Sequence, residues 1–228
     1  MKRLAYIPAR GGSKGIPKKN IAQVGDLPLI AFTIVAALKS GLFEHVMVST
    51  DSQEIADIAV QYGAWVPFLR DPAVAQDGTT TIATVMSDKA RLEAQGEKYD
   101  EFVLLQCTSP FRTAKDIQGA VALAEKHQAA VVSVSPVSDH PILMRTVDPD
   151  GKLTKLLKVS STCRRQDMPP FYRVNGAIYV NGWDELTPTL SFNDNPYGFV
   201  MEQKDSLDID SVADLTKARQ LVEAQSKL

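Results

Sequence analysis

Cysteine and histidine are scarce in this chain, which has two cysteines and three histidines among its 228 residues. Cys107 and Cys163 lie far apart in the sequence, and neither belongs to a pair with the spacing of a metal site. The histidines show no metal-like or triad-like spacing either. We therefore expect free thiols in a reducing cytoplasm, because disulfides persist mainly in oxidising compartments.

Long apolar runs and a strong excess of one charge are also missing. The apolar stretches are too short to cross a bilayer, and residues 1–3 lead directly into an apolar segment without the pattern of a signal peptide. The formal net charge of −2 gives no global basic field for nucleic acid or for an anionic membrane. We expect a cytoplasmic protein with no nucleic-acid partner and no membrane partner.

Two common nucleotide-binding motifs are absent as well. The glycines near the N-terminus, Gly11, Gly12 and Gly15, do not have the spacing of the dinucleotide fingerprint G-x-G-x-x-G. The same segment lacks the four residues that a Walker motif places between its first glycine and Gly-Lys-Ser/Thr. A dehydrogenase and a P-loop NTPase are therefore disfavoured.

The segment at residues 9–20, which we call the glycine loop, is rich in cations instead. It reads ARGGSKGIPKKN and carries Arg10, Lys14, Lys18 and Lys19 directly after a strand-like apolar run at residues 4–8. Glycines let backbone amides approach a ligand closely, and clustered cations neutralise a polyphosphate. The loop therefore predicts a polyphosphate site, with a solvated basic turn as the alternative.

Strand-like runs alternate with helical spacing through the first part of the chain. We predict strands at 4–8, 46–50, 65–68, 102–106 and 130–137, with helices between them. Asp51 to Glu54 resembles the capping box of the second helix. Later strands are expected at 177–180 and 198–201, and a last helix at 211–224. This order predicts an α/β fold, a doubly wound and mostly parallel sheet, in a single domain spanning residues 1–228.

The alternation breaks after Pro136. A strand-like segment at 141–147 and a second at 152–158 flank a strong turn sequence at 148–151, which predicts a hairpin. An isolated hairpin must bury its apolar side chains against something else. We predict that residues 139–170 form an inserted dimerisation arm, with a lid folded onto its own subunit as the alternative.

Two carboxylates near the C-terminus form the second chemical feature. Asp208 and Asp210 alternate along an extended segment, so both side chains are expected on one side. Two oxygen ligands on one face suit Mg²⁺ that is shared with substrate phosphates. The alternative is that Asp210 caps the last helix together with Ser211 and Asp214.

Five sequence blocks together resemble the sialic-acid-type cytidylyltransferases, the CMP-N-acylneuraminate synthetases. The blocks are residues 9–20 (ARGGSKGIPKKN), 48–51 (VSTD), 105–110 (LQCTSP), 173–179 (RVNGAIY) and 205–210 (DSLDID). They follow the family's order and cover most of the chain. The resemblance implies a Rossmann-like nucleotidyltransferase fold and a Mg²⁺-dependent homodimer.

The resemblance also implies a reaction. A nine-carbon 2-keto sugar acid, N-acetylneuraminate or an analogue such as legionaminate, attacks the α-phosphorus of CTP through its anomeric hydroxyl, and pyrophosphate leaves. The alternatives are a cytidylyltransferase for Kdo or pseudaminate, a nucleotidyltransferase that uses another base, and a non-catalytic nucleotide-binding regulator. The presence of Asp208 and Asp210 together with Arg10 and Lys19 argues against the regulator.

By this resemblance, the catalytic residues are Arg10, Lys19, Asp208 and Asp210, and the two aspartates are the metal ligands. The nucleotide-binding residues are Ala9, Arg10, Gly11, Gly12, Ser13, Lys19, Asn20, Arg70, Asp77, Thr80 and Thr81. The sugar-binding residues are Gln106, Arg164, Arg165, Arg173, Asn175, Tyr179 and Phe192. Residues alone leave other roles open: Arg70 could pair with Asp71, the threonines could cap a helix, and both aromatic rings could be core. The group that removes the anomeric proton also stays open among metal-linked hydroxide, Asp208 and solvent.

Overall fold

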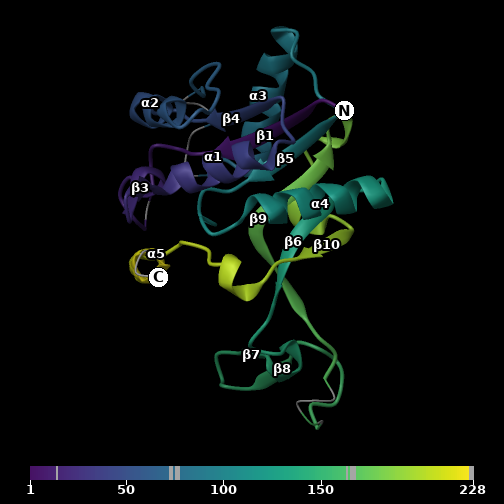
Figure 1. Ribbon diagram of the computed structural model, residues 1–228. Coiled ribbons are helices and arrows are strands. Elements are labelled where there is room, and N and C mark those ends of the chain that lie inside the picture. The colour runs from purple at the N-terminus through teal and green to yellow at the C-terminus, as the bar shows by residue number, and fades with distance from the viewer. Residues whose placement is uncertain (14, 72–73, 75–77, 163, 165–167, 226–228) are drawn as a thin grey trace.

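The computed structural model describes residues 1–13, 15–71, 74, 78–162, 164 and 168–225 (Figure 1). Within this part of the chain the α-helices are α1 (Leu29–Ser40), α2 (Gln53–Gln61), α3 (Thr81–Ala94), α4 (Ala114–His127) and α5 (Val212–Gln225). The main sheet contains β1 (Arg3–Pro8), β4 (His45–Ser49), β5 (Glu101–Leu105), β6 (Val131–Pro136), β9 (Tyr172–Gly182) and β10 (Tyr197–Val200). Two short antiparallel pairs stand outside it: β2 (Gln23–Val24) with β3 (Leu27–Pro28), and β7 (Arg145–Val147) with β8 (Leu153–Lys155).

The main sheet has the strand order β10-β6-β9-β5-β1-β4. β1 runs parallel to β4 and β5, and β6 runs parallel to β10, whereas β9 is antiparallel to both of its neighbours. The predicted α/β fold with a mostly parallel sheet is confirmed. The carboxyl ends of β1, β4 and β5 meet at one edge of the sheet, which is where open α/β sheets bind ligands.

Strand residues alternate between two apolar cores, as a period of two requires. Ala5 and Ile7 of β1 belong to the core beneath α1, α2 and α4. Leu4 and Tyr6 belong to the opposite core, which α3 covers together with Trp183. Figure 1 shows these helices on the two sides of the twisted sheet. Both faces are therefore covered, and ligands reach the sheet at its edge.

Two local predictions are wrong for identifiable reasons. The N-cap of α2 is Ser52, whose Oγ accepts from the Ile55 amide at 3.4 Å, and the Asp51 carboxylate instead accepts from the Gly11 amide at 2.8 Å. The predicted strand at 65–68 is a single bridge between Trp65 and Met47. Pro67 lacks the N–H group that would continue the ladder.

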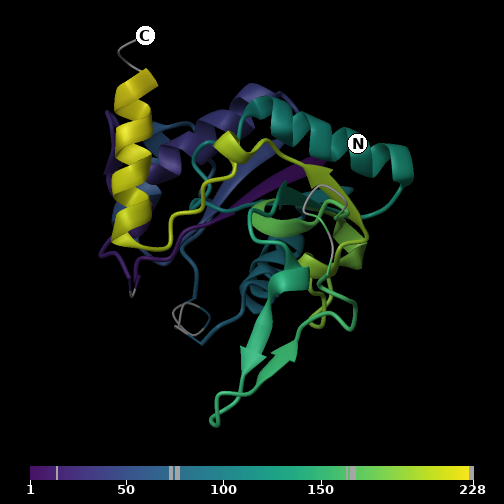
Figure 2. The same cartoon turned by 90° about the horizontal axis from the view of Figure 1, so that it is seen from below.

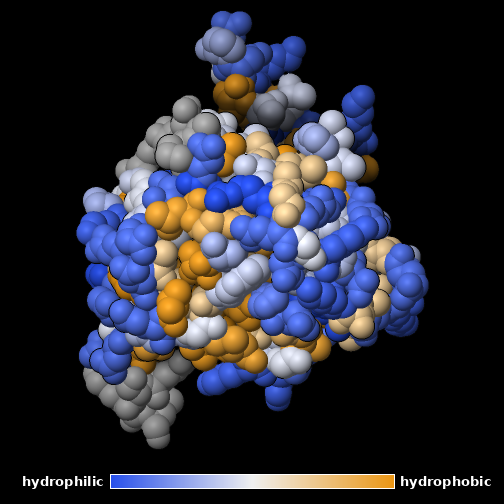
Figure 3. Space-filling model, turned by 90° about the horizontal axis from the view of Figure 1, so that it is seen from above, coloured by the Kyte–Doolittle hydropathy of each residue, from blue (hydrophilic) through white to orange (hydrophobic). Residues whose placement is uncertain are grey.

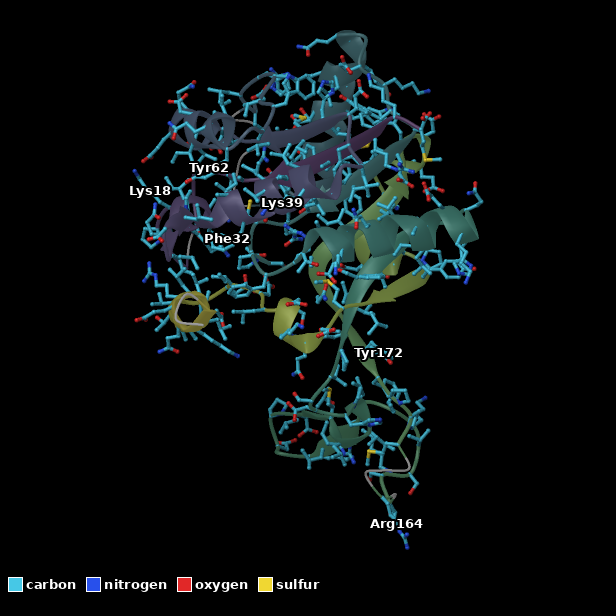
Figure 4. All side chains as sticks on the ribbon, viewed as in Figure 1. Lys18, Phe32, Lys39, Tyr62, Arg164 and Tyr172 are labelled. Carbon is cyan, nitrogen blue, oxygen red and sulfur yellow. The ribbon has the colours of Figure 1, made fainter. Side chains whose placement is uncertain are left out.

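The late strand expected at 177–180 is the eleven-residue strand β9. Its first half pairs with the end of β6, where Val134, Ser135 and Pro136 stand opposite Val174, Arg173 and Tyr172. These two strands continue out of the body as a stem, on which Figure 4 places Tyr172. The stem connects the sheet to the predicted arm.

The arm projects from the body beyond the stem (Figures 1 and 2). The hairpin is shorter than predicted, because Pro141–Leu143 forms a 3-10 turn and the strand begins at Arg145. Proline in the first turn favours this conformation, and His140 Nδ1 accepts from the Ile142 amide at 3.2 Å. Seen from above, the body shows apolar side chains bordered by hydrophilic ones, and the arm stands out beyond it (Figure 3).

Helix α5 lies beside residues 16–29 in Figure 2 and packs on them through a small separate core. Leu215 and Ala218 of α5 join Ile16, Val24 and Leu29 in this core. Gly25, at φ 62°, touches the helix so closely that an added Cβ would lie 2.6 Å from Val222. The C-terminal helix is thereby attached to the segment that contains the glycine loop. None of the described helices is both long and apolar enough to span a membrane.

Candidate functional site

The glycine loop leaves β1 at the carboxyl edge of the sheet and is held in shape by its own neighbours. The Ala9 amide donates to the Ser49 carbonyl at 2.9 Å, which fixes the loop's start against β4. The Asn20 side chain donates to the Arg10 carbonyl at 2.9 Å, which ties the loop's end to its beginning. Lys18 has a left-handed backbone, with φ 52°, and Figure 4 shows its side chain at the periphery of the body.

A pocket of about 320 Å³ opens between this loop and the start of α3. Its lining consists of Pro8, Arg10, Gly12, Ser13, Lys19, Asn20, Arg70, Val74, Thr79, Thr81, Thr84, Gln106, Cys107 and Thr108. We call it the nucleotide pocket, because it collects most of the predicted nucleotide-binding residues. Of the others, Ala9 and Gly11 donate their amides to Ser49 and Asp51 at the end of β4, and Thr80 caps α3. Asp77 and the loop residue Lys14 lie outside the described residues.

Lys19, which lines this pocket, contacts the segment that carries Asp208 and Asp210. The Lys19 ammonium donates to the Ile209 carbonyl at 2.9 Å and lies 3.4 Å from Asp210 Oδ1. An added Cβ on Gly15 would lie 3.1 Å from the Asp210 carbonyl, so the loop and the carboxylate segment pack closely. Ser211 and Asp214 form the cap of α5, and the Asp210 side chain contacts Lys19 instead of capping.

Asp208 lines a cavity next to the nucleotide pocket. Burial raises the pKa of its carboxyl group above the ordinary value, and a hydrogen bond from Thr108 acts against this shift. Its Oδ1 atom is buried and has no hydrogen-bond partner within the described part of the chain. A buried carboxylate oxygen without a donor fits a cation, and the exposed Asp210 carboxylate lies one residue beyond Ile209.

The neighbouring cavity has a volume of about 390 Å³, and we call it the sugar pocket because it collects several of the predicted sugar-binding residues. It is lined by Gln106, Arg173, Val174, Asn175, Gly176, Tyr179, Asn193 and Asp208. Gly176 has φ 77°, and an added Cβ there would lie 3.7 Å from Gln106 Oε1. This left-handed backbone brings β9 close to the Gln106 amide. Gln106 lines both this cavity and the nucleotide pocket, so the two are adjacent.

The cytidylyltransferase family matches residues 4–227 of this sequence. The chain belongs to that family.

Curated relatives and a solved structure agree with this assignment. The chain is 40% identical over 228 residues to the CMP-N,N'-diacetyllegionaminic acid synthase of Legionella pneumophila, covering 98% of this chain and 97% of that protein. It is 36% identical over 218 residues to an N-acylneuraminate cytidylyltransferase of Streptococcus agalactiae, and the match covers 92% of this chain but only 51% of that longer protein. The structure of CMP:2-keto-3-deoxy-manno-octonic acid synthetase complexed with CTP shares the fold, with a TM-score of 0.74 at 16% identity over 99% of this chain and 100% of that one. The resemblance carried by the sequence blocks is confirmed, and this cytidylyltransferase is a nucleotidyltransferase enzyme.

The aromatic residues predicted near the sugar lie in one wall of this cytidylyltransferase's site. Tyr179 donates to Asn193 Oδ1 at 3.1 Å, and its pKa is raised by burial and by the nearby Asp208 charge. Phe192 is buried and stacks on Phe102, with 6.1 Å between ring centroids. Both rings line a further cavity of about 380 Å³, which Gln106 also lines. They serve the core and the cavity wall together.

Other predicted sugar-binding residues occupy different positions. Asn175 lines the sugar pocket, but its Oδ1 accepts from Ser133 at 2.6 Å and from the Ala177 amide at 3.2 Å. Its side chain therefore supports the bend at Gly176. Arg173 faces the sugar pocket from the stem. Arg164 lies at the far end of the arm in Figure 4, away from the pockets of its own chain, and Arg165 lies outside the described residues.

Sequence reasoning missed two buried charged residues behind the pockets. Arg112 is buried, and its Nη1 donates to the carbonyls of Gln106 at 3.1 Å and Ala177 at 2.9 Å, joining β5 to β9 beside the sugar pocket. Burial lowers the pKa of Arg112 to about 10. Asp88 is buried in α3 behind the nucleotide pocket. A signal was available for Asp88, because it continues the inward-facing series of Val85 and Leu92.

Proposed function

We propose that the chain transfers CMP from CTP to the anomeric hydroxyl of a sialic-acid-type sugar acid with nine carbons, releasing pyrophosphate. The observation that carries this proposal is the position of Gln106, which lines the nucleotide pocket and the sugar pocket at the point where they meet. An acceptor in one pocket and a nucleotide in the other would have their reacting groups side by side. Positioning of this kind supplies a large part of catalysis in phosphoryl transfer.

Arg10 and Lys19 would stabilise the charge that develops on the leaving pyrophosphate. Both line the nucleotide pocket, with Ser13 and Gly12 between them in the loop. Their charge acts at a fixed position, so little reorganisation is required when the α-phosphorus is attacked. The amide of Gln106 cannot act as an ordinary base near neutral pH, so its role is to bind and orient the sugar.

Asp208 and Asp210 would hold Mg²⁺ together with the phosphates of CTP. The buried, unpartnered Oδ1 of Asp208 supports this assignment, and a hard oxygen donor set is what Mg²⁺ prefers. The described residues contain no group of three or more metal-ligating side chains, which agrees with an ion that takes its other ligands from substrate and water. When bound, the ion would neutralise charge on the reacting phosphates.

Arg173 would bind the sugar carboxylate, because a guanidinium can donate to both oxygens of a carboxylate in one plane. Legionaminate-type acids are the first candidates for the sugar. The reason is the 40% identity, across 98% of the chain, to a protein named as a CMP-N,N'-diacetyllegionaminic acid synthase. N-acetylneuraminate follows, while pseudaminate and Kdo are the alternatives.

A substrate panel tests this proposal directly. Pyrophosphate release should be measured with CTP and Mg²⁺ plus each of N,N'-diacetyllegionaminate, N-acetylneuraminate, pseudaminate and Kdo. We expect the highest kcat/KM with one of the first two sugars and none with ATP, GTP or UTP at equal concentration. Fastest turnover with Kdo would reject the nine-carbon acceptor, and binding of CTP without pyrophosphate release on any sugar would favour a regulator.

We further propose that the active form is a cytoplasmic homodimer, in which the chain is one nucleotidyltransferase domain and residues 139–170 are its dimerisation arm. The arm exposes several large apolar side chains: Leu143, Met144, Val147, Leu153, Leu156 and Val159. A two-stranded hairpin with such a surface is marginally stable alone, so burial against a second copy would stabilise it. The arm would then bring Arg164 and Arg165 toward the sugar pocket of the other copy.

The hairpin itself offers a matched test of the homodimer. Val147 and Leu153 face each other across β7 and β8 and are 65% and 62% exposed. Replacing both with lysine should convert the dimer to monomers in sedimentation velocity, because two charges would be buried at the interface. The neighbouring pair Thr146 and Thr154 points to the other side of the hairpin, so its double lysine variant should remain dimeric. A Val147/Leu153 variant that stays dimeric would refute the arm's role.

A further inference from the structure

Four buried polar side chains form a connected network directly behind the nucleotide pocket. They are Tyr6 on β1, Ser49 at the end of β4, Asp88 on α3 and Arg70, which also lines the pocket. Ser49 Oγ and Tyr6 Oη both bond to Asp88 Oδ2, the latter at 2.7 Å. Arg70 reaches Ser49 Oγ through Nε at 3.1 Å and Nη2 at 3.0 Å. All four residues are at least nine-tenths buried.

The chemistry of the groups fixes the direction of these hydrogen bonds. Both hydroxyls donate to Oδ2 of Asp88, which has acceptor lone pairs for them. Ser49 has a single hydroxyl proton, which it donates in its hydrogen bond to Asp88. The lone pairs of the Ser49 oxygen are then available to accept from the Arg70 guanidinium. Burial, with a further contribution from Asp88, raises the pKa of Tyr6, which keeps the phenol protonated as a donor. Asp88 thus orients the Ser49 hydroxyl as an acceptor for Arg70.

The backbone completes the fixation of Arg70. Its Nη2 also donates to the Ser49 carbonyl at 2.8 Å, and its amide donates to the Thr50 carbonyl at 2.7 Å. Among the described residues no direct ion pair joins Arg70 to Asp88, so the carboxylate reaches the cation through the serine. Thr84, one helical turn before Asp88 on α3, lines the nucleotide pocket as well. The network therefore connects Asp88, on the buried face of α3, with Arg70 in the lining of the pocket.

We propose that Asp88 is a positioning residue for nucleotide binding, which acts through Ser49 to hold the Arg70 guanidinium in the CTP-binding orientation. The inference rests on the proposed function, because it takes CTP as the ligand of this pocket. Asp88 itself does not line the nucleotide pocket. Its effect is to prepare Arg70 before CTP arrives, so that less ordering is needed on binding.

Two single-hydroxyl deletions test the inference as a matched pair. Ser49→Ala and Tyr6→Phe each remove one donor to Asp88, but only Ser49 also accepts from Arg70. We expect Ser49→Ala to raise the dissociation constant of CTP, measured by calorimetry with Mg²⁺ and without sugar, by about tenfold, the loss of one hydrogen bond to a charged group. Tyr6→Phe should lower the melting temperature while the CTP dissociation constant stays unchanged. The kcat of both variants at saturating CTP should match that of the wild type.

Asp88→Asn then tests the carboxylate through a double-mutant cycle. Alone it should weaken CTP binding, and in the Ser49→Ala background it should add nothing, because Asp88 acts through Ser49. The inference is overturned if Ser49→Ala binds CTP normally, or if Tyr6→Phe weakens binding as much as Ser49→Ala does. It is also overturned if Asp88→Asn weakens binding equally in both backgrounds. If Asp88→Asn does not fold, the comparison of Ser49→Ala with Tyr6→Phe still tests the inference.

The wild-type protein separates this inference from the proposed function. A wild type that neither binds CTP nor releases pyrophosphate would overturn the proposed function before any variant is compared. A wild type that does both, with a Ser49→Ala variant of equal affinity, would overturn only the positioning role of Asp88.

Discussion

Replacing Lys19 with methionine is expected to lower kcat by about 10²–10³-fold, the effect of removing one preorganised group that stabilises transition-state charge. Lys19 is the cation through which the glycine loop meets the carboxylate segment, at 2.9 Å from the Ile209 carbonyl and 3.4 Å from Asp210 Oδ1. Methionine keeps the approximate length of the side chain and removes its charge and its donors. Steady-state kinetics of pyrophosphate release, with the melting temperature of each variant, measure this outcome.

Lys18 provides the matched control for this substitution. It is the adjacent residue with the same side chain, but its ammonium pairs with Glu54 at 2.7 Å on the surface, and the side chain is 65% exposed against 16% for Lys19. An exposed pair of this kind contributes about 0–1 kcal/mol to stability. Lys18→Met should therefore retain wild-type kcat. Equal losses in the two variants would show that overall loop charge matters and that Lys19 has no specific role.

Replacing Asp208 with asparagine is expected to raise the Mg²⁺ concentration needed for half-maximal activity and to lower kcat by about 10²-fold or more. The asparagine side chain keeps the volume and one oxygen but lacks the charge that attracts the ion. It would also present an amide donor where Oδ1 of Asp208 is buried without a partner among the described residues. The measurement is a Mg²⁺ titration of pyrophosphate release at saturating CTP and sugar.

Asp214 is a structural carboxylate in the same segment and serves as the control. It accepts from the Ser211 amide at 2.8 Å and the Ser211 hydroxyl at 2.7 Å, capping α5. Asp214→Asn should lower the melting temperature through the weakened cap and leave the Mg²⁺ titration unchanged. An unaltered titration in Asp208→Asn would assign that carboxylate a structural role like that of Asp214.

The parts of the site that sequence reasoning could predict are those whose signal is contiguous. The glycine loop gathers its cations within one segment, and Asp208 and Asp210 are two residues apart. The spacing of these residues and their position next to predicted strands are enough to predict a phosphate site and a metal site without knowledge of the fold. The alternation of strand-like and helical segments predicted the α/β sheet for the same reason, since each element is local in sequence.

The network behind Arg70 could not be predicted in this way, because its members come from four separate segments. Only the topology brings Tyr6 of β1 and Ser49 of β4 beneath the inner face of α3. A polar residue such as Asp88 on an amphipathic helix is usually on the solvated side, and only its place in the series with Val85 and Leu92 indicated otherwise. The hydrogen-bond partner of a buried polar group is determined by the tertiary structure.

The direction of β9 is a second feature that sequence could not determine. Its first half carries Arg173 and Asn175 and the left-handed Gly176, and this composition is not typical of a buried strand. Its antiparallel orientation follows from the arm, since a chain that leaves the body at the end of β6 and returns along the same stem must run in the opposite direction. The inserted segment thus reverses a strand in the middle of the sheet.

The packing of α5 on residues 16–29 has a consequence for the order in which the enzyme folds during synthesis. Lys19 and Ile209, which touch in the finished site, are 190 residues apart, so the ribosome produces the glycine loop long before the aspartate segment. The core that joins them, with Leu215 and Ala218 against Val24 and Leu29, can close only after α5 has emerged. Translation therefore delivers a chain whose sheet can assemble early, while the contact between the glycine loop and the aspartate segment forms only after every strand of that sheet has been made.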